Sequence, residues 1–163
     1  MDKIIYNVLE TLEKNGYESY VIGGYVRDKI LGISTMDIDI TTKAKPKEVL
    51  NIFKGYDVKL HDYGNVSFKC DNYKFDITTF RKDVKYINNR KPEKIVYIDS
   101  FLEDLKRRDF TINSMCLDMD DNIIDIYDGR KDLKRKIVRS IGDPYKKMEE
   151  DVLRILRAIR FCS

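Results

Sequence analysis

The sequence carries one histidine, three cysteines and no apolar run long enough to cross a bilayer. The single histidine, His61, excludes a histidine-rich metal centre. Cys70, Cys116 and Cys162 are odd in number, widely spaced and unaccompanied by histidines, which predicts reduced, mostly buried thiols rather than a zinc site or a disulfide framework. Because an apolar stretch of ~20 residues and a signal peptide are both missing, we expect a soluble, cytoplasmic chain with no membrane partner.

Charged residues are abundant, but neither sign dominates. The 163 residues include 31 Lys and Arg against 28 Asp and Glu, a net charge of +3, so the overall charge is a weak argument for nucleic-acid binding. Basic residues gather at 106–108, 130–139 and 154–160. A solvated surface is the ordinary interpretation of the first two clusters. The length fits one domain, or one domain and the start of another.

Hydrophobic periodicity predicts an α+β fold with a mixed or mostly antiparallel sheet. Helices are expected at 2–15, 26–31, 46–53, after Ser100, and from near Glu149 onward. Strands are expected at 20–22, 36–41, 56–60, 66–70, 73–80, 112–117, 123–126 and 137–140. The stretch 81–99 is polar, contains Pro92 and has no clear period, which predicts a long irregular loop.

Asp37 and Asp39 are separated by one residue on a predicted strand. Side chains at i and i+2 of a strand share a face, ~6.5 Å apart, so the two carboxylates repel each other unless a cation lies between them. Hard divalent ions that bridge phosphate oxygens are the usual partner. The preceding Gly23 and Gly24 can bring bare backbone close to a phosphate, and Arg27 can hold it with two hydrogen bonds. Asp-x-Asp alone is common in turns, but together these residues predict a metal-dependent nucleoside triphosphate site.

The predicted last helix carries a polar pair, Asp151 and Arg154, beside an apolar face. That face consists of Val152, Ile155, Leu156 and Ile159. A surface ion pair is the ordinary interpretation of such a pair. The alternative is a base reader, because a carboxylate accepts and a guanidinium donates hydrogen bonds. Cytosine and adenine match that pattern, whereas uracil and guanine would leave buried polar groups unpaired.

Four motifs occur in an order that resembles the class II tRNA nucleotidyltransferases, which are the bacterial CCA-adding enzymes, and their relatives the bacterial poly(A) polymerases. The motifs are Gly23-Gly24-Tyr25-Val26-Arg27-Asp28, Asp37-Ile38-Asp39, Arg107-Arg108-Asp109-Phe110-Thr111-Ile112-Asn113 and Glu150-Asp151-Val152-Leu153-Arg154. The resemblance extends from about residue 20 to 161. It implies a polymerase-beta-type nucleotidyltransferase head at 1–140, with helices flanking the sheet, and the start of a helical neck at 141–163.

The resemblance also implies roles for individual residues. Asp37 and Asp39 would hold Mg²⁺ and act in catalysis, and Asp76 is a candidate third carboxylate, although a structural aspartate is an equal interpretation. Asp109 would contact the ribose, and Asp151 with Arg154 would read the base. The nucleotide-binding residues implied are Gly23, Gly24, Arg27, Asp28, Arg108, Asp109, Asn113, Asp151, Arg154, Arg157 and Arg160. In the 81–99 segment, Arg90 and Pro92 match recurring features of the family.

The implied reaction is attack of the 3′-OH of tRNA on the α-phosphate of CTP or ATP, which adds C and A and releases pyrophosphate. Two alternatives stay open. One is the head of an A-adding or poly(A) polymerase, and the other is a nucleotide- or RNA-binding module that is inactive without a missing half. Because the sequence ends inside the implied base-reading helix, we expect a truncated chain, a natural fragment or half of a split enzyme. Its tRNA affinity would then be poor, and a partner chain would supply the neck, body and tail.

Overall fold

The computed structural model describes residues 1–87 and 91–162, which form an α+β fold around a seven-stranded sheet of order β3-β4-β5-β2-β1-β8-β9. The strands are β1 Ser19–Ile22, β2 Asp37–Thr42, β3 Lys59–Leu60, β4 Val66–Cys70, β5 Tyr73–Thr79, β6 Arg81–Ile87, β7 Lys91–Tyr97, β8 Cys116–Leu117 and β9 Ile123–Ile124. The helices are α1 Lys3–Lys14, α2 Gly24–Leu31, α3 Pro46–Ile52, α4 Phe101–Lys106, α5 Gly129–Arg135, α6 Pro144–Glu150 and α7 Leu153–Cys162, with a 3₁₀ turn at Thr111–Asn113. The predicted fold class is therefore confirmed.

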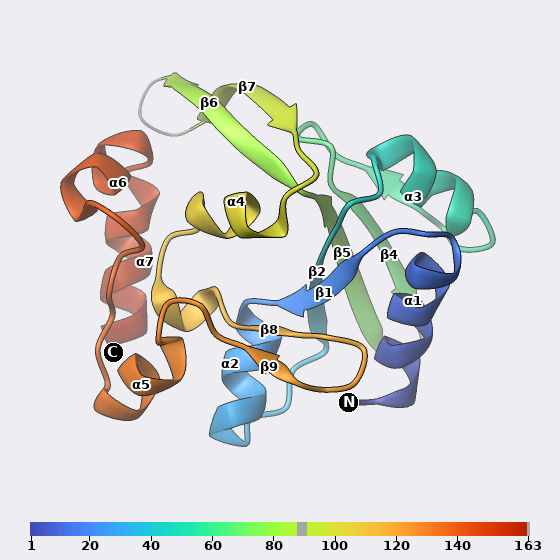
Figure 1. Cartoon of the computed structure of the whole chain (residues 1–163), viewed down its shortest axis with the longest axis horizontal. Helices are drawn as coiled ribbons and strands as arrows, with labels where there is room; N and C mark the ends of the chain where they lie inside the picture. The colour runs from blue at the N-terminus through green and yellow to red at the C-terminus, as the bar shows by residue number, and fades with distance from the viewer. Residues whose placement is uncertain (88–90, 163) are drawn as a thin grey trace.

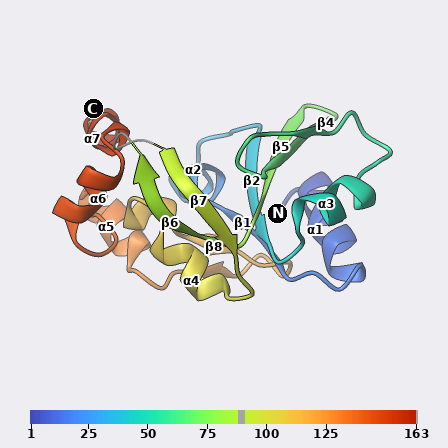
Figure 2. The ribbon, with the colours of Figure 1, turned by 90° about the horizontal axis from the view of Figure 1, so that it is seen from above.

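Helices flank the sheet at both ends of the molecule. Helices α1 and α3 lie together at one end, and α5, α6 and α7 lie at the other (Figures 1 and 2). Helix α1 buries the apolar face that its periodicity predicts, with Ile5, Val8, Leu9 and Leu12 in the core. The same core takes the inward side chains of β2, Ile38 and Ile40. Burial of these residues fixes which face of β2 points outward.

Strand register places the predicted catalytic aspartates side by side. Strand β2 runs parallel to β5, and the register pairs Asp39 with Asp76 and Asp37 with Lys74. On the other side, β1 runs antiparallel to β2 and pairs Ile22 with Asp39. Since β1 leads directly into Gly23, the glycine turn and the aspartates meet at the same edge of the sheet.

The predicted loop at 81–99 was wrong: most of this segment is a hairpin. Strands β6 and β7 pair only with each other, in a two-stranded sheet separate from the main one (Figure 1). Such a ribbon does not have to bury one face in the core, so it needs no apolar alternation, and Val84 and Val96 are exposed. Arg90, which the family resemblance singled out, lies outside the described residues.

Two predictions for residues 112–140 were also wrong. The expected strand at 112–117 begins as the 3₁₀ turn, and 137–140 contributes only an isolated bridge between Ser140 and Phe110. Helix α5 was not predicted at all. It begins where the Asp125 carboxylate accepts hydrogen bonds from the amides of Gly129 and Arg130, at 2.7 and 2.9 Å. Because the capping side chain lies four residues before Gly129 rather than directly before the helix, the sequence did not indicate where α5 begins.

The single C-terminal helix predicted from near Glu149 is two helices. Asp143 caps α6 by accepting hydrogen bonds from the amides of Tyr145 and Lys146, and Pro144 occupies its first turn. Helix α6 ends at Glu150, Asp151 is extended with φ −147°, and α7 begins at Leu153. The break falls within the proposed base-reading motif.

All three cysteines are free. Cys116 is buried and Cys70 half-buried, whereas Cys162 is exposed, contrary to the expected burial. Within residues 1–87 and 91–162, no helix is long and apolar enough to cross a membrane.

Candidate active site

A cavity of about 660 Å³ opens between the main sheet, the start of β6 and helix α7. Its lining includes most of the predicted nucleotide-binding residues, namely Gly23, Gly24, Arg27, Arg108, Asp109, Asn113, Asp151, Arg154, Arg157 and Arg160, together with Asp39. Asp28, Asp37 and Asp76 are not in this lining. The volume lies in the range of small-molecule sites, ~300–1,000 Å³, and the lining is rich in cationic groups, which suits a phosphorylated ligand.

The glycine turn delivers bare backbone to the cavity. Gly23 has φ 79° and ψ −129°, a backbone conformation that favours glycine, and its amide donates to the Met115 carbonyl at 3.3 Å. A Cβ atom at Gly23 would lie 3.6 Å from Asp39 Oδ2, so the positive φ, rather than lack of space, requires glycine here. Helix α2 begins immediately afterwards at Gly24, so its positive N-terminal end faces the cavity.

Arg27 is held in place by two predicted site residues. Its Nη1 donates to Asn113 Oδ1 at 2.8 Å, and its Nε and Nη2 donate to Asp28 Oδ1 at 2.9 and 2.7 Å. The Arg27 guanidinium also lies over the Phe161 ring, 5.0 Å from its centroid. Asp28 therefore orients Arg27 from beside the cavity.

Asn113 Nδ2 and Arg108 Nε are two buried donors in the cavity lining for which no hydrogen bond or ion pair is found among the described residues. Arg81 Nε, a third buried donor of the lining, also lacks a hydrogen-bond partner but lies 3.3 Å from Asp83 Oδ1. The Asn113 side chain is 7% exposed. A buried unpaired donor costs about 1–3 kcal/mol, and such groups are rare in folded proteins unless a ligand or water completes them. Both donors suit the oxygen atoms of a phosphate or a sugar.

Asp39 lines the cavity, and two further aspartates lie beside it, Asp37 on the same strand and Asp76 opposite it on β5. Partial loss of hydration is the largest cause that raises the pKa of Asp39, although the residue stays exposed on the outward face of β2; the facing Asp76 carboxylate raises the pKa further, and Arg108 opposes both effects. Asp76 accepts a hydrogen bond from Asn65 Nδ2 at 2.7 Å. Lys74 Nζ lies 4.0 Å from Asp37 Oδ1. The ionised Asp39 thus lacks full compensation, as expected at a site that gains a cation.

The donor set fits a hard divalent cation. Within the described part of the chain, no group of three acidic, histidine or cysteine side chains is arranged to hold a metal. Mg²⁺ usually takes only one or two carboxylates from the protein and completes its shell with water and substrate phosphates. Asp37 and Asp39 lie on the same face of β2 beside a cationic cavity, and this arrangement matches the coordination that Mg²⁺ prefers.

Asp109 ties α7 to the cavity. Its Oδ2 accepts hydrogen bonds from Arg157 Nε and lies 2.7 Å from Arg157 Nη2, while its Oδ1 accepts from the Phe110 amide at 2.7 Å. If Asp109 contacts a ribose as expected, its carboxylate would therefore bind both the ribose and Arg157.

Asp151 and Arg154 both line the cavity, but not as neighbours on one helix flank. Arg154 is buried, and its Nη1 donates to Glu150 Oε2 and to the Lys147 carbonyl, both at 2.7 Å. Asp151 lies before α7, where its carboxylate accepts a hydrogen bond from the Leu153 amide at 3.0 Å. The predicted helical spacing was wrong because Asp151 caps α7 instead of lying within it. The expected apolar face of α7 is exposed, with Leu156 and Ile159 more than 60% accessible.

Sequence reasoning assigned no site role to five residues of the lining: Tyr63, Arg81, Asp83, Arg107 and Phe161. Arg81 and Asp83 lie two apart on β6 and pair at 3.3 Å, but the segment was predicted as a loop. Phe161 follows Arg157 by four residues, one helical turn, and that spacing was a usable signal. The Phe161 ring packs edge-on against Phe110, 6.0 Å between centroids.

Replacing Asp39 by Asn is expected to raise the melting temperature near neutral pH in metal-free buffer. A carboxyl whose pKa is raised by folding destabilises the folded state when it is ionised. The gain should therefore be present above the raised pKa and disappear once the pH falls below the ordinary carboxyl pKa. Thermal melts of wild type and Asp39→Asn across this pH range test it. Asp37→Asn is the control because the Asp37 side chain is 81% exposed. An Asp39→Asn protein that is less stable than wild type at neutral pH would contradict a raised pKa of Asp39 in the folded state.

The chain matches the family model described as "Poly A polymerase head domain" over residues 19–139. It is 44% identical over 157 residues to the CCA-adding enzyme of Lactobacillus helveticus, covering 96% of this chain and 39% of that protein. A crystal structure of the Bacillus stearothermophilus CCA-adding enzyme in complex with CTP superposes with a TM-score of 0.85 at 34% identity, over 100% of this chain and 40% of the other.

A tRNA nucleotidyltransferase complexed with a primer tRNA and an incoming ATP analog gives a TM-score of 0.75 at 31% identity, over 94% of this chain and 44% of that one. The chain thus spans about two fifths of the length of the relatives it matches. The family model covers most of the chain, from β1 to the segment after α5, and includes the glycine turn and the aspartates. The chain therefore belongs to the family of poly A polymerase head domains.

Proposed function

We propose that this chain is the catalytic head of an enzyme that adds C and A, from CTP and ATP, to the 3′ end of tRNA without a nucleic-acid template. The buried, unpaired donors of Asn113 and Arg108, in a cationic cavity beside Asp37 and Asp39, carry the proposal. The relatives named as CCA-adding enzymes, one bound to CTP, support this choice of substrates. Residues 1–140 would form the head, and 141–163 the start of a neck.

In this proposal the triphosphate lies against the glycine turn and the arginines. The Gly24 amide region at the start of α2 and the Arg27 guanidinium face the phosphates, and Arg108 Nε supplies a further donor. Asn113 Nδ2 donates to the sugar or to a phosphate oxygen. Because Asp28 and Asn113 already hold Arg27, its guanidinium needs little reorganisation when the nucleotide binds.

Asp37 and Asp39 would hold Mg²⁺, with the nucleotide phosphates completing its coordination. When bound, the ion would lower the pKa of the attacking 3′-hydroxyl and neutralise the charge on the leaving pyrophosphate. Asp76 faces Asp39 across the strand pair and is held by Asn65, so it would supply the third carboxylate beside the attacking group. The chain's own part is to fix this carboxylate geometry next to the arginines that receive the triphosphate.

Asp151 and Arg154 would read the base from the far wall of the cavity. Arg157 and Arg160 lie on the next turns of α7 and line the same cavity. Reading cytosine or adenine would require the Asp151 carboxylate to turn from the Leu153 amide toward the base. Arg154, whose guanidinium bonds Glu150 and the Lys147 and Arg107 carbonyls, would have to redirect one of its donors to the ring nitrogen.

A labelled transfer assay tests this function. Purified chain is mixed with Mg²⁺ and with tRNA transcripts that end before the CCA, after the first C, or after CC. We expect label from CTP on the first two transcripts and from ATP on the third, with growth stopping at CCA. Growth by A alone, or an unlimited A tail, would instead identify the head of an A-adding or poly(A) polymerase. No transfer to any transcript at saturating tRNA would contradict the proposed activity for this chain.

A further inference from the structure

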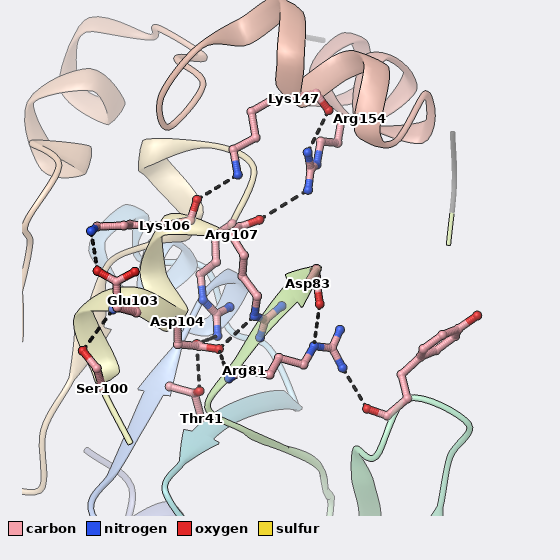
Figure 3. A network of polar contacts seen from close by, with 12 residues as sticks. Thr41, Arg81, Asp83, Ser100, Glu103, Asp104, Lys106, Arg107, Lys147 and Arg154 are labelled. Atoms are coloured by element: carbon pink, nitrogen blue, oxygen red, sulfur yellow. Dashed lines mark hydrogen bonds and ion pairs between the residues drawn. The ribbon is translucent and has the colours of Figure 1, made fainter. Parts of the chain in front are cut away.

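A buried carboxylate outside the cavity lining, Asp104 of α4, is the centre of a polar network that reaches the site from behind (Figure 3). The Asp104 side chain is 0% exposed. Burial would raise its pKa, but the Arg108 and Arg107 guanidiniums outweigh burial and lower the pKa below the ordinary value. The buried carboxylate is therefore ionised near neutral pH, and its charge is balanced only by the groups it holds.

Asp104 holds both arginines of the motif that precedes Asp109. Its Oδ1 accepts from Arg107 Nε at 2.8 Å, and its Oδ2 accepts from Arg108 Nη2 at 3.1 Å. The second of these bonds holds the Arg108 guanidinium through Nη2, and the neighbouring Nε has no hydrogen-bond partner among the described residues. Asp104 thus fixes one nitrogen of the Arg108 guanidinium and leaves the Nε donor for a ligand.

The same carboxylate also bonds the strands that build the rest of the site. Thr41 Oγ1, on β2 two residues after Asp39, donates to Asp104 Oδ2 at 3.0 Å. The Arg81 amide, at the start of β6, donates to Oδ1 at 3.1 Å. Asp104 therefore links the strand of the catalytic aspartates to the arginines and to the hairpin.

The network continues to the C-terminal helices through the end of α4. The Lys106 carbonyl accepts from Lys147 Nζ of α6 at 2.8 Å, and the Arg107 carbonyl accepts from Arg154 Nη2 of α7 at 3.3 Å (Figure 3). Residues 106–108 therefore contact Asp104 through the Arg107 and Arg108 side chains and contact the C-terminal helices through the carbonyls of Lys106 and Arg107.

We propose that Asp104 is a positioning residue for nucleotide binding: it holds Arg108 through Nη2 so that the unpartnered Nε donor meets the triphosphate. The proposal rests on the proposed function, in which Arg108 binds phosphate. It assigns Asp104 no contact with the substrate. Losing its charge would leave Arg107 and Arg108 adjacent without their common counter-ion and would release Arg108 from its fixed orientation.

The test is a double-mutant cycle with Asp104→Asn and Arg108→Lys, which keeps the charge of Arg108 but not its fork. Binding of CTP and of inorganic tripolyphosphate is measured with Mg²⁺ by calorimetry, and each variant is first checked for a cooperative thermal transition. The matched control is Glu103→Gln, the preceding residue on α4, whose carboxylate pairs with Lys106 away from the cavity.

We expect Asp104→Asn to weaken binding of both ligands by about tenfold or more, because this corresponds to the loss of one charge-assisted hydrogen bond. In the Arg108→Lys background the same change should cost less than about threefold, because Asp104 acts through Arg108. Wild-type-like binding of Asp104→Asn, or fully additive losses, would overturn the proposal while leaving the proposed function intact. If wild type binds neither ligand, the proposed function fails and this inference with it.

Should Asp104→Asn lack a cooperative transition, Asp104→Glu takes its place in the same cycle. The longer acid keeps the charge but displaces the carboxylate in a site without spare room. Weaker binding that again disappears in the Arg108→Lys background supports the positioning role. Unchanged binding, or a loss that adds to that of Arg108→Lys, contradicts it.

Discussion

Asp39→Ala is expected to abolish nucleotidyl transfer, lowering its rate by at least about 1,000-fold. This loss corresponds to the several kcal/mol by which a bound metal stabilises the transition state. Asp39 and Asp37 share the outward face of β2, and Asp39 lines the cavity that contains the glycine turn and the arginines. Without Asp39, the divalent ion would lose a ligand at the point where it meets the triphosphate. Initial rates of CMP transfer to tRNA, measured over a range of Mg²⁺ concentrations, give the size of the effect.

Folding should survive the same substitution, because neither aspartate is in the core. Thermal melts should therefore show a cooperative transition for Asp39→Ala and Asp37→Ala. Asp57→Ala is the matched control, an exposed aspartate in the turn before β3 that should keep full transfer activity. Normal transfer by either catalytic-site variant would refute the metal assignment, and loss in all three variants would indicate a nonspecific effect.

Gly129→Ala is expected to destabilise the fold by about 2–3 kcal/mol, lowering the melting temperature by about 5–10 °C. A Cβ at Gly129 would lie 2.4 Å from the Thr111 carbonyl oxygen and 2.8 Å from Met115 Cγ. The first of these atoms belongs to the backbone of the 3₁₀ turn that carries Asn113, so it cannot move without shifting the site. Calorimetric or circular-dichroism melts give the loss directly.

Gly55→Ala provides the comparison for this prediction. Its Cβ would meet no atom within 4 Å, and its φ is not in the positive range, so its stability should stay close to wild type. Equal melting temperatures for Gly129→Ala and Gly55→Ala would show that α5 does not pack against the 3₁₀ turn as described. Since Asn113 is part of that turn, we also expect weaker nucleotide binding by Gly129→Ala.

The elements nearest the aspartates could be predicted from sequence because local signals and tertiary demands agree there. Ile38 and Ile40 alternate with Asp37 and Asp39, and alternation of this kind is what a half-buried strand requires. Gly32 closes α2 in the left-handed conformation expected of a helix-ending glycine. In this part of the chain, burial, chain direction and turn chemistry all favour the same strand and helix boundaries.

Other parts depended on contacts that are distant in sequence. On β6 the largely buried side chains that alternate along the strand, Arg81 and Asp83, are charged rather than apolar, so they give no hydrophobic period, and α5 is capped by Asp125 from outside the helix. The role of Asp104 depends on partners as far away as Thr41, 63 residues earlier. No spacing rule links Asp104 to Thr41, so that part of the network could be found only from the structure. Arg107 and Arg108, in contrast, follow Asp104 by three and four residues, a helical spacing that the sequence does show.

The most direct test of the account is equilibrium binding of CTP, ATP, UTP and GTP to this chain with Mg²⁺ and with excess chelator, for wild type and Asp151→Ala. We expect that CTP and ATP bind more tightly than UTP and GTP, that the chelator weakens binding, and that Asp151→Ala removes the preference while triphosphate binding remains. Asp151→Ala should also keep a cooperative melt, because the Asp151 side chain bonds only the Leu153 amide at the start of α7 among the hydrogen bonds described. Equal binding of all four nucleotides by wild type, or no binding at all, would contradict it.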